Sequence, residues 1–145
     1  MGLEAAYVNG PISIQGEYIG ARENMSNFSI LQNDHYNLNA YYGFFSWFIT
    51  GEHRVYNLSA GHFNRVHPKK NFGENGGTGA FQLSIRYSSV DLNDKDLRGG
   101  KLKDLTVGLN WYLNPATRLM FNYINSDAEN MGNVNAYLMR FQVDF

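Results

Sequence analysis

Basic side chains that could attract anions are concentrated in one part of this 145-residue chain, residues 51–79. The four cations of this segment are Arg54, Arg65, Lys69 and Lys70. Only two carboxylates, those of Glu52 and Glu74, stand against them. Cationic groups in a narrow opening of low dielectric concentrate anions and replace part of their hydration shell. The segment is therefore either an element that attracts anions or a solvated basic loop.

Three further arginines occur on segments where apolar and polar residues alternate. Arg86, Arg118 and Arg140 each fall on the polar face of such a segment. The planar guanidinium presents a fork of donors that suits phosphate oxygens, so the set is a candidate for anion recognition. For any single arginine, an ion pair with an acid on the same face, such as Glu17 or Asp144, is the favoured interpretation.

The histidines of segment 51–79 could suggest a metal site. His53, His62 and His67 have a spacing that matches no common zinc pattern, and the chain contains no cysteine. We therefore expect no bound metal and no other cofactor. An enzyme such as a phospholipase or protease is disfavoured too. Its histidine would have to lie beside a nucleophile and a carboxylate, whereas these histidines lie in loops or at the start of a strand.

The elements that must position these residues are predicted to be strands throughout, because no segment shows a helical period. The expected strands cover residues 3–9, 12–22, 36–50, 80–89, 104–113 and 117–125, with a seventh at the end of the chain. The polar stretches 23–34, 91–103 and 126–133 are expected to be loops. Alternation is blurred in the third segment, and a bulge near Gly43 would explain this.

The end of the chain alternates most clearly. Its apolar positions are Tyr137, Met139, Phe141, Val143 and Phe145. A strand that runs to a terminal aromatic resembles the signal by which the barrel-assembly machinery recognises and inserts bacterial outer-membrane β-barrels. Here Tyr137, Phe141 and Phe145 would form that insertion signal. The alternative at this point is the last strand of a soluble sandwich.

Composition favours a membrane protein built from strands. Hydrophobic residues make up 43% of the chain and the mean hydropathy is −0.40, yet aromatic residues reach 15%. In a transmembrane barrel only the outward residues meet lipid, so the average hydropathy stays low. Trp47, Trp111 and Tyr112 are expected among the aromatics at the membrane interfaces. The net charge of −1 gives no drive toward nucleic acid, and none is expected as a partner.

The connections between the expected strands differ in kind. Gly10-Pro11 and Asn114-Pro115 are tight turns on one side, and the polar stretches fall on the other. The sequence therefore predicts an all-β fold, an antiparallel meander of about seven strands curved like the wall of a transmembrane β-barrel. Segment 51–79 lies on the side of the tight turns but is far too long for one. We expect it to fold partly against the concave face and to add positive potential there.

The period of two assigns each strand residue to one face of the sheet. The apolar set expected on the convex, lipid-facing side comprises Phe81, Leu83, Ile85, Leu105, Val107, Leu109, Phe121, Phe141 and Phe145. The concave side is expected to carry Arg86, Asn110, Arg118 and Arg140. If the chain were instead a small soluble ligand-binding β-barrel of the lipocalin kind, the apolar set would fill a closed interior.

Several stretches resemble the phosphate-selective porin O and P family. They are LEAAYVNGP (residues 3–11), SIQGEY (13–18), FITGEHRVY (48–56), FNRVHPKKNF (63–72), LTVGLNWYLNP (105–115) and MRFQVDF (139–145). These stretches keep the order of the family and span nearly the whole chain. The set is specific, although each stretch alone is a weak signal.

The resemblance implies an outer-membrane barrel of about 16 strands, usually a homotrimer, that passes phosphate or polyphosphate and is not an enzyme. The chain would supply the C-terminal part, with residues 1–145 as a single barrel segment. An odd number of strands leaves open edges that lipid does not tolerate, so we expect a piece of a larger porin. No signal-peptide pattern precedes Gly2, which fits a mature form or such a piece. The family's inward-folded loops further upstream, which hold many of its constriction residues, have no counterpart here.

Overall fold

One antiparallel sheet of seven long strands makes up most of the computed structural model, which describes residues 1–24, 35–57, 59 and 61–145. Its strands are β1 (Gly2–Asn9), β2 (Ile12–Asn24), β3 (His35–Phe48), β6 (Ala80–Asp94), β7 (Leu97–Asn114), β8 (Thr117–Ala128) and β9 (Gly132–Val143), and they neighbour one another in that order. A two-stranded ribbon, β4 (Tyr56–Asn57) with β5 (His62–Phe63), lies within the connection from β3 to β6. The predicted all-β antiparallel meander is confirmed.

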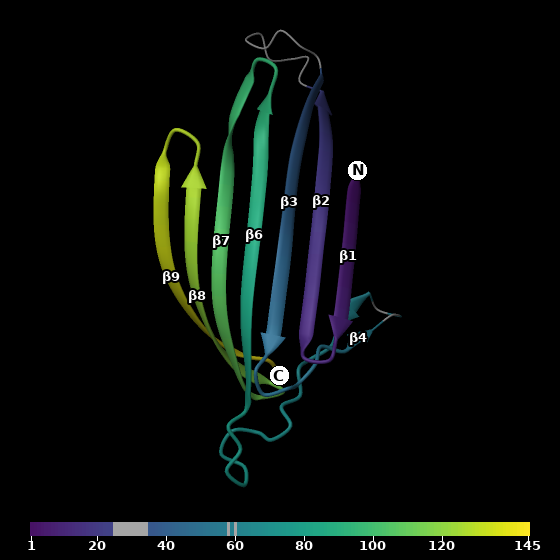
Figure 1. Ribbon diagram of the computed structural model, residues 1–145, viewed down its shortest axis with the longest axis vertical. Coiled ribbons are helices and arrows are strands. Elements are labelled where there is room, and N and C mark those ends of the chain that lie inside the picture. The colour runs from purple at the N-terminus through teal and green to yellow at the C-terminus, as the bar shows by residue number, and fades with distance from the viewer. Residues whose placement is uncertain (25–34, 58, 60) are drawn as a thin grey trace.

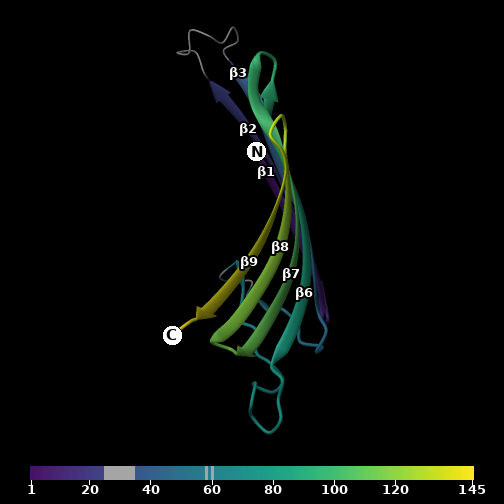
Figure 2. The same ribbon diagram turned by 90° about the vertical axis from the view of Figure 1, so that its left-hand side faces the viewer.

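The sheet is curved and twisted like part of a barrel wall (Figure 1, Figure 2). The β1–β2 turn, the β7–β8 turn and the C-terminus gather at one end, and the β6–β7 hairpin reaches toward the other (Figure 1). The connection from β3 to β6 leaves the end with the tight turns, and its β4 stands on the concave side (Figure 1, Figure 2). Within the described ranges there is no long apolar helix of the kind that spans a bilayer.

Several strands are longer than the sequence predicts, whereas β3 ends two residues before its expected end at residue 50. β6 and β7 run through most of the expected loop 91–103 and leave a turn at residues 95–96, and β8 and β9 reduce the expected loop 126–133 to residues 129–131. Strand ends that extend into water need no apolar face, so the period of two cannot detect them. The expected loop 23–34 lies mostly outside the described residues.

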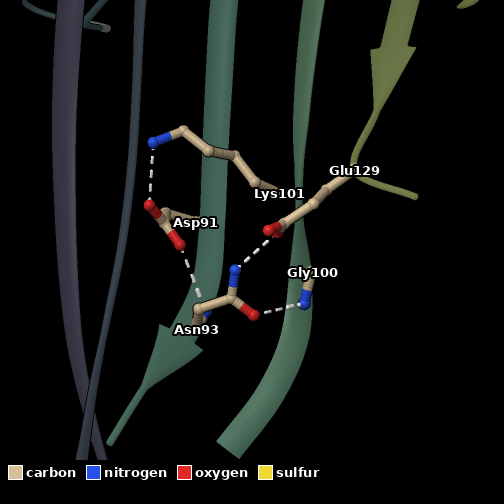
Figure 3. Close-up of polar contacts among 5 residues, drawn as sticks. All are labelled: Asp91, Asn93, Gly100, Lys101 and Glu129. Atoms are coloured by element: carbon tan, nitrogen blue, oxygen red, sulfur yellow. Dashed lines mark hydrogen bonds and ion pairs between the residues drawn. The ribbon is translucent and has the colours of Figure 1, made fainter. Parts of the chain in front are cut away.

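Polar side chains support the extended ends of β6 and β7 (Figure 3). Lys101 Nζ forms an ion pair of 2.9 Å with Asp91 across the two strands. Asn93 Nδ2 donates to Glu129 Oε2 at 2.6 Å, and Asn93 Oδ1 accepts from Gly100 N at 2.8 Å. These contacts link the extended ends of β6 and β7 to each other and to the β8–β9 turn.

The bulge expected near Gly43 is not formed. Pairing runs without interruption from Gly16 through Gly43 to Tyr87, and the register shifts within the described ranges involve β7 instead. Alternation in β3 is blurred because its concave face is aromatic as well as its convex face. The aromatic residues of that concave face are Tyr36, Tyr42, Phe44 and Phe48.

Side chains alternate between the faces as predicted. One row in register on the convex side consists of Ile14, Phe45, Ile85, Val107, Tyr123 and Tyr137, and a second consists of Leu83, Leu109, Phe121 and Met139. Ile85 and Val107 are each 44% exposed and Phe141 is 60% exposed. These apolar side chains do not fill a closed interior, which contradicts the lipocalin alternative. Phe145 follows the end of β9 and is fully exposed.

A small core forms on the concave face. Phe48, Ala80 and Tyr112 are buried together, and Val66 packs against them. Since Val66 belongs to segment 51–79, the expectation that this segment folds partly against the concave face is confirmed. The expectation that Tyr112 is an interface aromatic is wrong: its side chain is only 9% exposed and its ring lies 5.8 Å from the ring of Phe48.

Trp47 and Trp111 do lie on the convex face, in line with their parity. The Trp111 ring stacks on Phe81 with 5.4 Å between the ring centroids. Its Nε1 donates a hydrogen bond of 2.7 Å to Thr78 O. This bond joins the last residues of the β3–β6 connection to the C-terminal end of β7.

We expect Val107→Arg to prevent stable insertion into a membrane and Thr106→Arg to be tolerated. Val107 lies in the middle of β7 on the convex face, and its neighbour Thr106 faces the concave side. A guanidinium that faces lipid near the midplane destabilises a barrel by about 2–4 kcal/mol, whereas one in an aqueous lumen does not. The measurement is the heat-modifiable, folded fraction of the full-length protein in outer membranes. Equal losses in both variants would contradict the assignment of faces.

Candidate anion site

The connection between β3 and β6 is fixed to the sheet near both of its ends. Ile49 N donates to Phe81 O at 2.9 Å, and Phe72 N donates to Leu113 O at 2.7 Å. Between these points Val66 packs into the small core of the concave face. The part of the connection around Val66 therefore lies against the concave side of the sheet.

Arg54 is held between this connection and the sheet. Its guanidinium carbon lies 3.7 Å from the ring centroid of Phe63 in β5 and 6.0 Å from that of Phe44 in β3. Nη1 donates to Gln15 Oε1 of β2 at 3.5 Å. Partial burial lowers the pKa of the Arg54 guanidinium, which still remains a cation at neutral pH. The side chain is thus a fixed positive charge on the concave face.

Arg86 and Arg118 face the same side from neighbouring parts of the sheet. The Arg86 guanidinium lies 4.6 Å from the ring centroid of Tyr42, and that of Arg118 lies 5.9 Å from the ring centroid of Tyr112. Arg118 also donates to Gln142 Oε1 from Nε at 3.2 Å and from Nη2 at 2.9 Å. Each of these guanidiniums, like that of Arg54, therefore lies against an aromatic ring.

Acids do not neutralise these arginines in the described part of the chain. The ion pair found there, between Lys101 and Asp91, lies far along the strands from this site. Arg118 reaches Asp144 only through Gln142, whose Nε2 donates to Asp144 Oδ1 at 2.8 Å. The interpretation in which a single arginine pairs with Glu17 or Asp144 is therefore not supported.

The three arginines line one hollow of about 360 Å³ on the concave face. Its other lining residues are Gln15, Tyr42, Phe44, Gln82, Asn110, Tyr112 and Met120, and none of them is acidic. An adjoining hollow of about 240 Å³ shares Arg54 and Arg118 and adds Arg65 and Asp144. The site thus consists of two neighbouring spaces that have two guanidiniums in common.

A hydrogen-bonded chain of side chains forms the floor of the larger hollow. Ser46 Oγ bonds Ser13 Oγ at 2.7 Å and accepts from Gln82 Nε2 at 3.0 Å. Gln82 Oε1 accepts from Asn110 Nδ2 and from Tyr112 OH, both at 3.0 Å. Four strands are linked in this way, so the polar wall beneath the arginines is rigid.

The other candidate residues lie apart from this hollow. Lys69 is occupied by its own segment, since its Nζ donates to Thr50 O at 3.1 Å. Lys70 is exposed, and Arg140 is exposed on β9, the outer strand of the sheet. Among the described residues, no histidines and carboxylates are grouped so that they could hold a metal ion.

The aromatic rings that contact the arginines were not predicted from the sequence, and neither was the contact of Gln15 with Arg54. A signal was present for three of them, because Tyr42 and Phe44 in β3 and Tyr112 in β7 occupy positions of polar parity, where a solvated lumen face would carry no rings. Phe63 gave no such signal, because the irregular segment around it has no period. Its contact with Arg54 becomes visible only when the connection is folded.

Known proteins resemble this chain. The family described as phosphate-selective porin O and P matches residues 1–145. Porin O of Pseudomonas aeruginosa is 28% identical over an alignment of 145 positions, which covers 92% of this chain and 31% of that protein. A protein of Caulobacter vibrioides is 39% identical over 82 residues, 57% of this chain and 16% of that protein. The chain thus spans about a third or less of the length of these relatives.

The family match includes every strand of the sheet together with the connection that carries Arg54. The match therefore extends over the whole sequence and does not depend on one motif. The chain belongs to the phosphate-selective porin O and P family, whose members are outer-membrane channels of Gram-negative bacteria and not enzymes.

Proposed function

We propose that residues 1–145 form a single segment, the C-terminal part, of an outer-membrane porin through which anions such as phosphate or polyphosphate diffuse. The observation that carries this proposal is the convergence of Arg54, Arg86 and Arg118 on a hollow whose lining includes no carboxylate. The name of the matched family points to the same class of anion. In a closed barrel, the concave face would be the wall of the lumen.

The arrangement of the three arginines suits an oxyanion. Several guanidiniums in one confined wall raise the local concentration of anions. Each aromatic ring covers one face of its guanidinium and leaves the in-plane N–H donors at the edge available to oxygen atoms. Neutral amides such as those of Gln82 and Asn110 can replace part of the hydration shell. An anion held against one wall is bound weakly enough to leave, as conduction requires.

The rest of the barrel would come from other strands of a longer protein. β1 and β9 are the outer strands of the sheet. They run in the same direction, because neighbouring strands are antiparallel and the sheet has an odd number of strands. They cannot close the sheet by pairing antiparallel with each other, and open edges are not tolerated in lipid. The length of Porin O, of which this chain covers 31%, supports the same view.

The proposal also assigns partners to the full-length protein. The exposed apolar rows of the convex face suit outer-membrane lipid. The barrel-assembly machinery would recognise the last strand, and the complete barrel would assemble as a homotrimer. Of the remaining anion-site candidates, Arg65 lines the smaller hollow. Lys69, Lys70 and Arg140 would contribute only to the overall electrostatic potential of the wall.

Each of Arg54→Gln, Arg86→Gln and Arg118→Gln should lower the preference for anions over cations. Each substitution removes one positive charge from the hollow, and the loss should be largest at low salt, where screening is weakest. The measurement is the reversal potential of full-length channels in planar bilayers under a salt gradient. Lys70→Gln is the control, because it removes the same charge outside the hollow, from the connection that also carries Arg54.

An equal change in Lys70→Gln and the three arginine variants would mean that only the overall charge matters. Unchanged selectivity in all three arginine variants would place the selective constriction elsewhere in the full-length protein. Either result would contradict a specific anion site on this wall.

Deletion of Phe145 from the full-length protein should lower its level in the outer membrane without changing the selectivity of the channels that do form. Phe145 lies beyond β9 and contributes to neither hollow. The measurement is the amount of folded protein in outer-membrane fractions, followed by reversal potentials of the purified channels. Normal membrane levels would rule out an insertion role for the terminal aromatic.

A further inference from the structure

Glu52 is a nearly fully buried carboxylate at the start of the β3–β6 connection, with 4% of its surface exposed. Its Oε1 accepts a hydrogen bond of 3.1 Å from the backbone N of Lys69. Its Oε2 accepts a hydrogen bond from Thr50 Oγ1. A buried carboxylate is stable only when such donors satisfy it, so these contacts fix its position.

The partners of Glu52 are themselves bound to the sheet and to each other. Thr50 Oγ1 accepts from Phe81 N of β6 at 3.0 Å, and Thr50 O accepts from Lys69 Nζ at 3.1 Å. Thr50, Glu52 and Lys69 therefore form a closed set of contacts, which we name the clasp. Because the clasp joins residue 52 to residue 69, it closes the intervening stretch into a loop.

Gly51 permits this closure. Its backbone φ is +81°, a left-handed conformation that side chains disfavour, and a Cβ there would lie 2.7 Å from Lys69 Nζ. Its N donates to Phe48 O at 3.0 Å, so the chain turns sharply as it leaves β3. The turn places Glu52 against Lys69 and directs Arg54, two residues later, over the concave face.

We propose that Glu52 is a positioning residue for anion selectivity: through the clasp it holds Arg54 between Phe63 and Phe44 in the hollow. This inference rests on the proposed function. In it, a negatively charged residue stabilises the position of a cation in an anion-selective site. It also gives Lys69 a structural role in place of the anion-attracting role expected from the sequence.

The clasp and a simple charge effect predict opposite results when the carboxylate is removed. If Glu52 acted only through its charge, its removal would make the wall more positive and raise the preference for anions. If it positions Arg54, its removal frees the loop, the guanidinium leaves the hollow and the preference falls. The sign of the change therefore distinguishes the two roles.

The test compares Glu52→Ala with Glu74→Ala in the full-length protein. Glu74 is an exposed acid of the same connection whose side chain bonds Asn71 of that connection, so its removal changes the charge equally without opening the clasp. We expect the anion-to-cation permeability ratio to fall by about threefold in Glu52→Ala and to stay level or rise in Glu74→Ala. Glu52→Gln should recover part of the loss, because an amide oxygen can still accept from Lys69 N. A rise in Glu52→Ala would overturn the proposal.

A double variant tests whether Glu52 acts through Arg54. Combining Glu52→Ala with Arg54→Gln should lower the ratio no further than Arg54→Gln alone, since residues that act through one contact are not additive. Additive losses would overturn the positioning role. If Arg54→Gln left the ratio unchanged while Arg86→Gln or Arg118→Gln lowered it, Glu52 could not control selectivity through Arg54, and the positioning role would be overturned. If all three arginine variants left the ratio unchanged, the proposed function would fail. The clasp would then be judged separately by tryptic cleavage after Arg54 and Arg65, which should be faster in Glu52→Ala and unchanged in Glu74→Ala.

Thr50→Val provides a second route if Glu52→Ala does not assemble. It keeps the shape and net charge of the wall but removes the hydroxyl that bonds both Glu52 and Phe81 N. The proposal expects a fall in the anion-to-cation ratio and faster tryptic cleavage after Arg54. Unchanged selectivity and unchanged cleavage in Thr50→Val would overturn it.

Discussion

The alternation of side chains across a single-layered sheet is the constraint on which the rest of this structure depends. With one layer of strands there is no interior to bury an apolar face, so the convex rows stay exposed and the ladder of backbone hydrogen bonds carries the fold. The same alternation leaves every second residue for the concave face. Polar chemistry can therefore be placed there without interrupting the apolar surface, and Arg86 and Arg118 occupy such positions next to apolar neighbours.

Aromatic rings serve the arginines of the concave face better than acids would. A carboxylate orients a guanidinium strongly but cancels its charge, and the attraction for anions is lost with it. A ring attracts the face of the guanidinium, restricts its orientation and leaves its charge in place. The contacts of Arg54 with Phe63, and of Arg86 with Tyr42, follow this scheme. The contact of Tyr42 with Arg86 gives one aromatic residue on the concave face of β3 a role.

The sequence could predict the features that depend on the period of two in the strands. It could predict little about the features that depend on how the irregular β3–β6 connection folds. The strand order, the faces and the concave positions of Arg86 and Arg118 follow from alternation and short turns. The roles of Arg54 and Lys69 do not, because both are basic residues of one aperiodic segment. Their difference arises from the fold of the connection, which buries Glu52 against Lys69 N and leaves Arg54 over the sheet. Tyr112 was wrongly predicted to lie at a membrane interface, because that prediction followed its aromatic character and not its position on the polar face of the strand.

The length of the β3–β6 connection requires a physical reason. β3 and β6 are paired neighbours, with Phe48 opposite Gln82, so a turn of a few residues could join them. Ordering a much longer connection loses conformational entropy, which must be offset by contacts. The core around Phe48 and Val66, the backbone bonds at both ends and the clasp provide such contacts. These contacts fix the connection to the wall at several points while Arg54 stays in the hollow. Under the proposed function, such an element would narrow the pore.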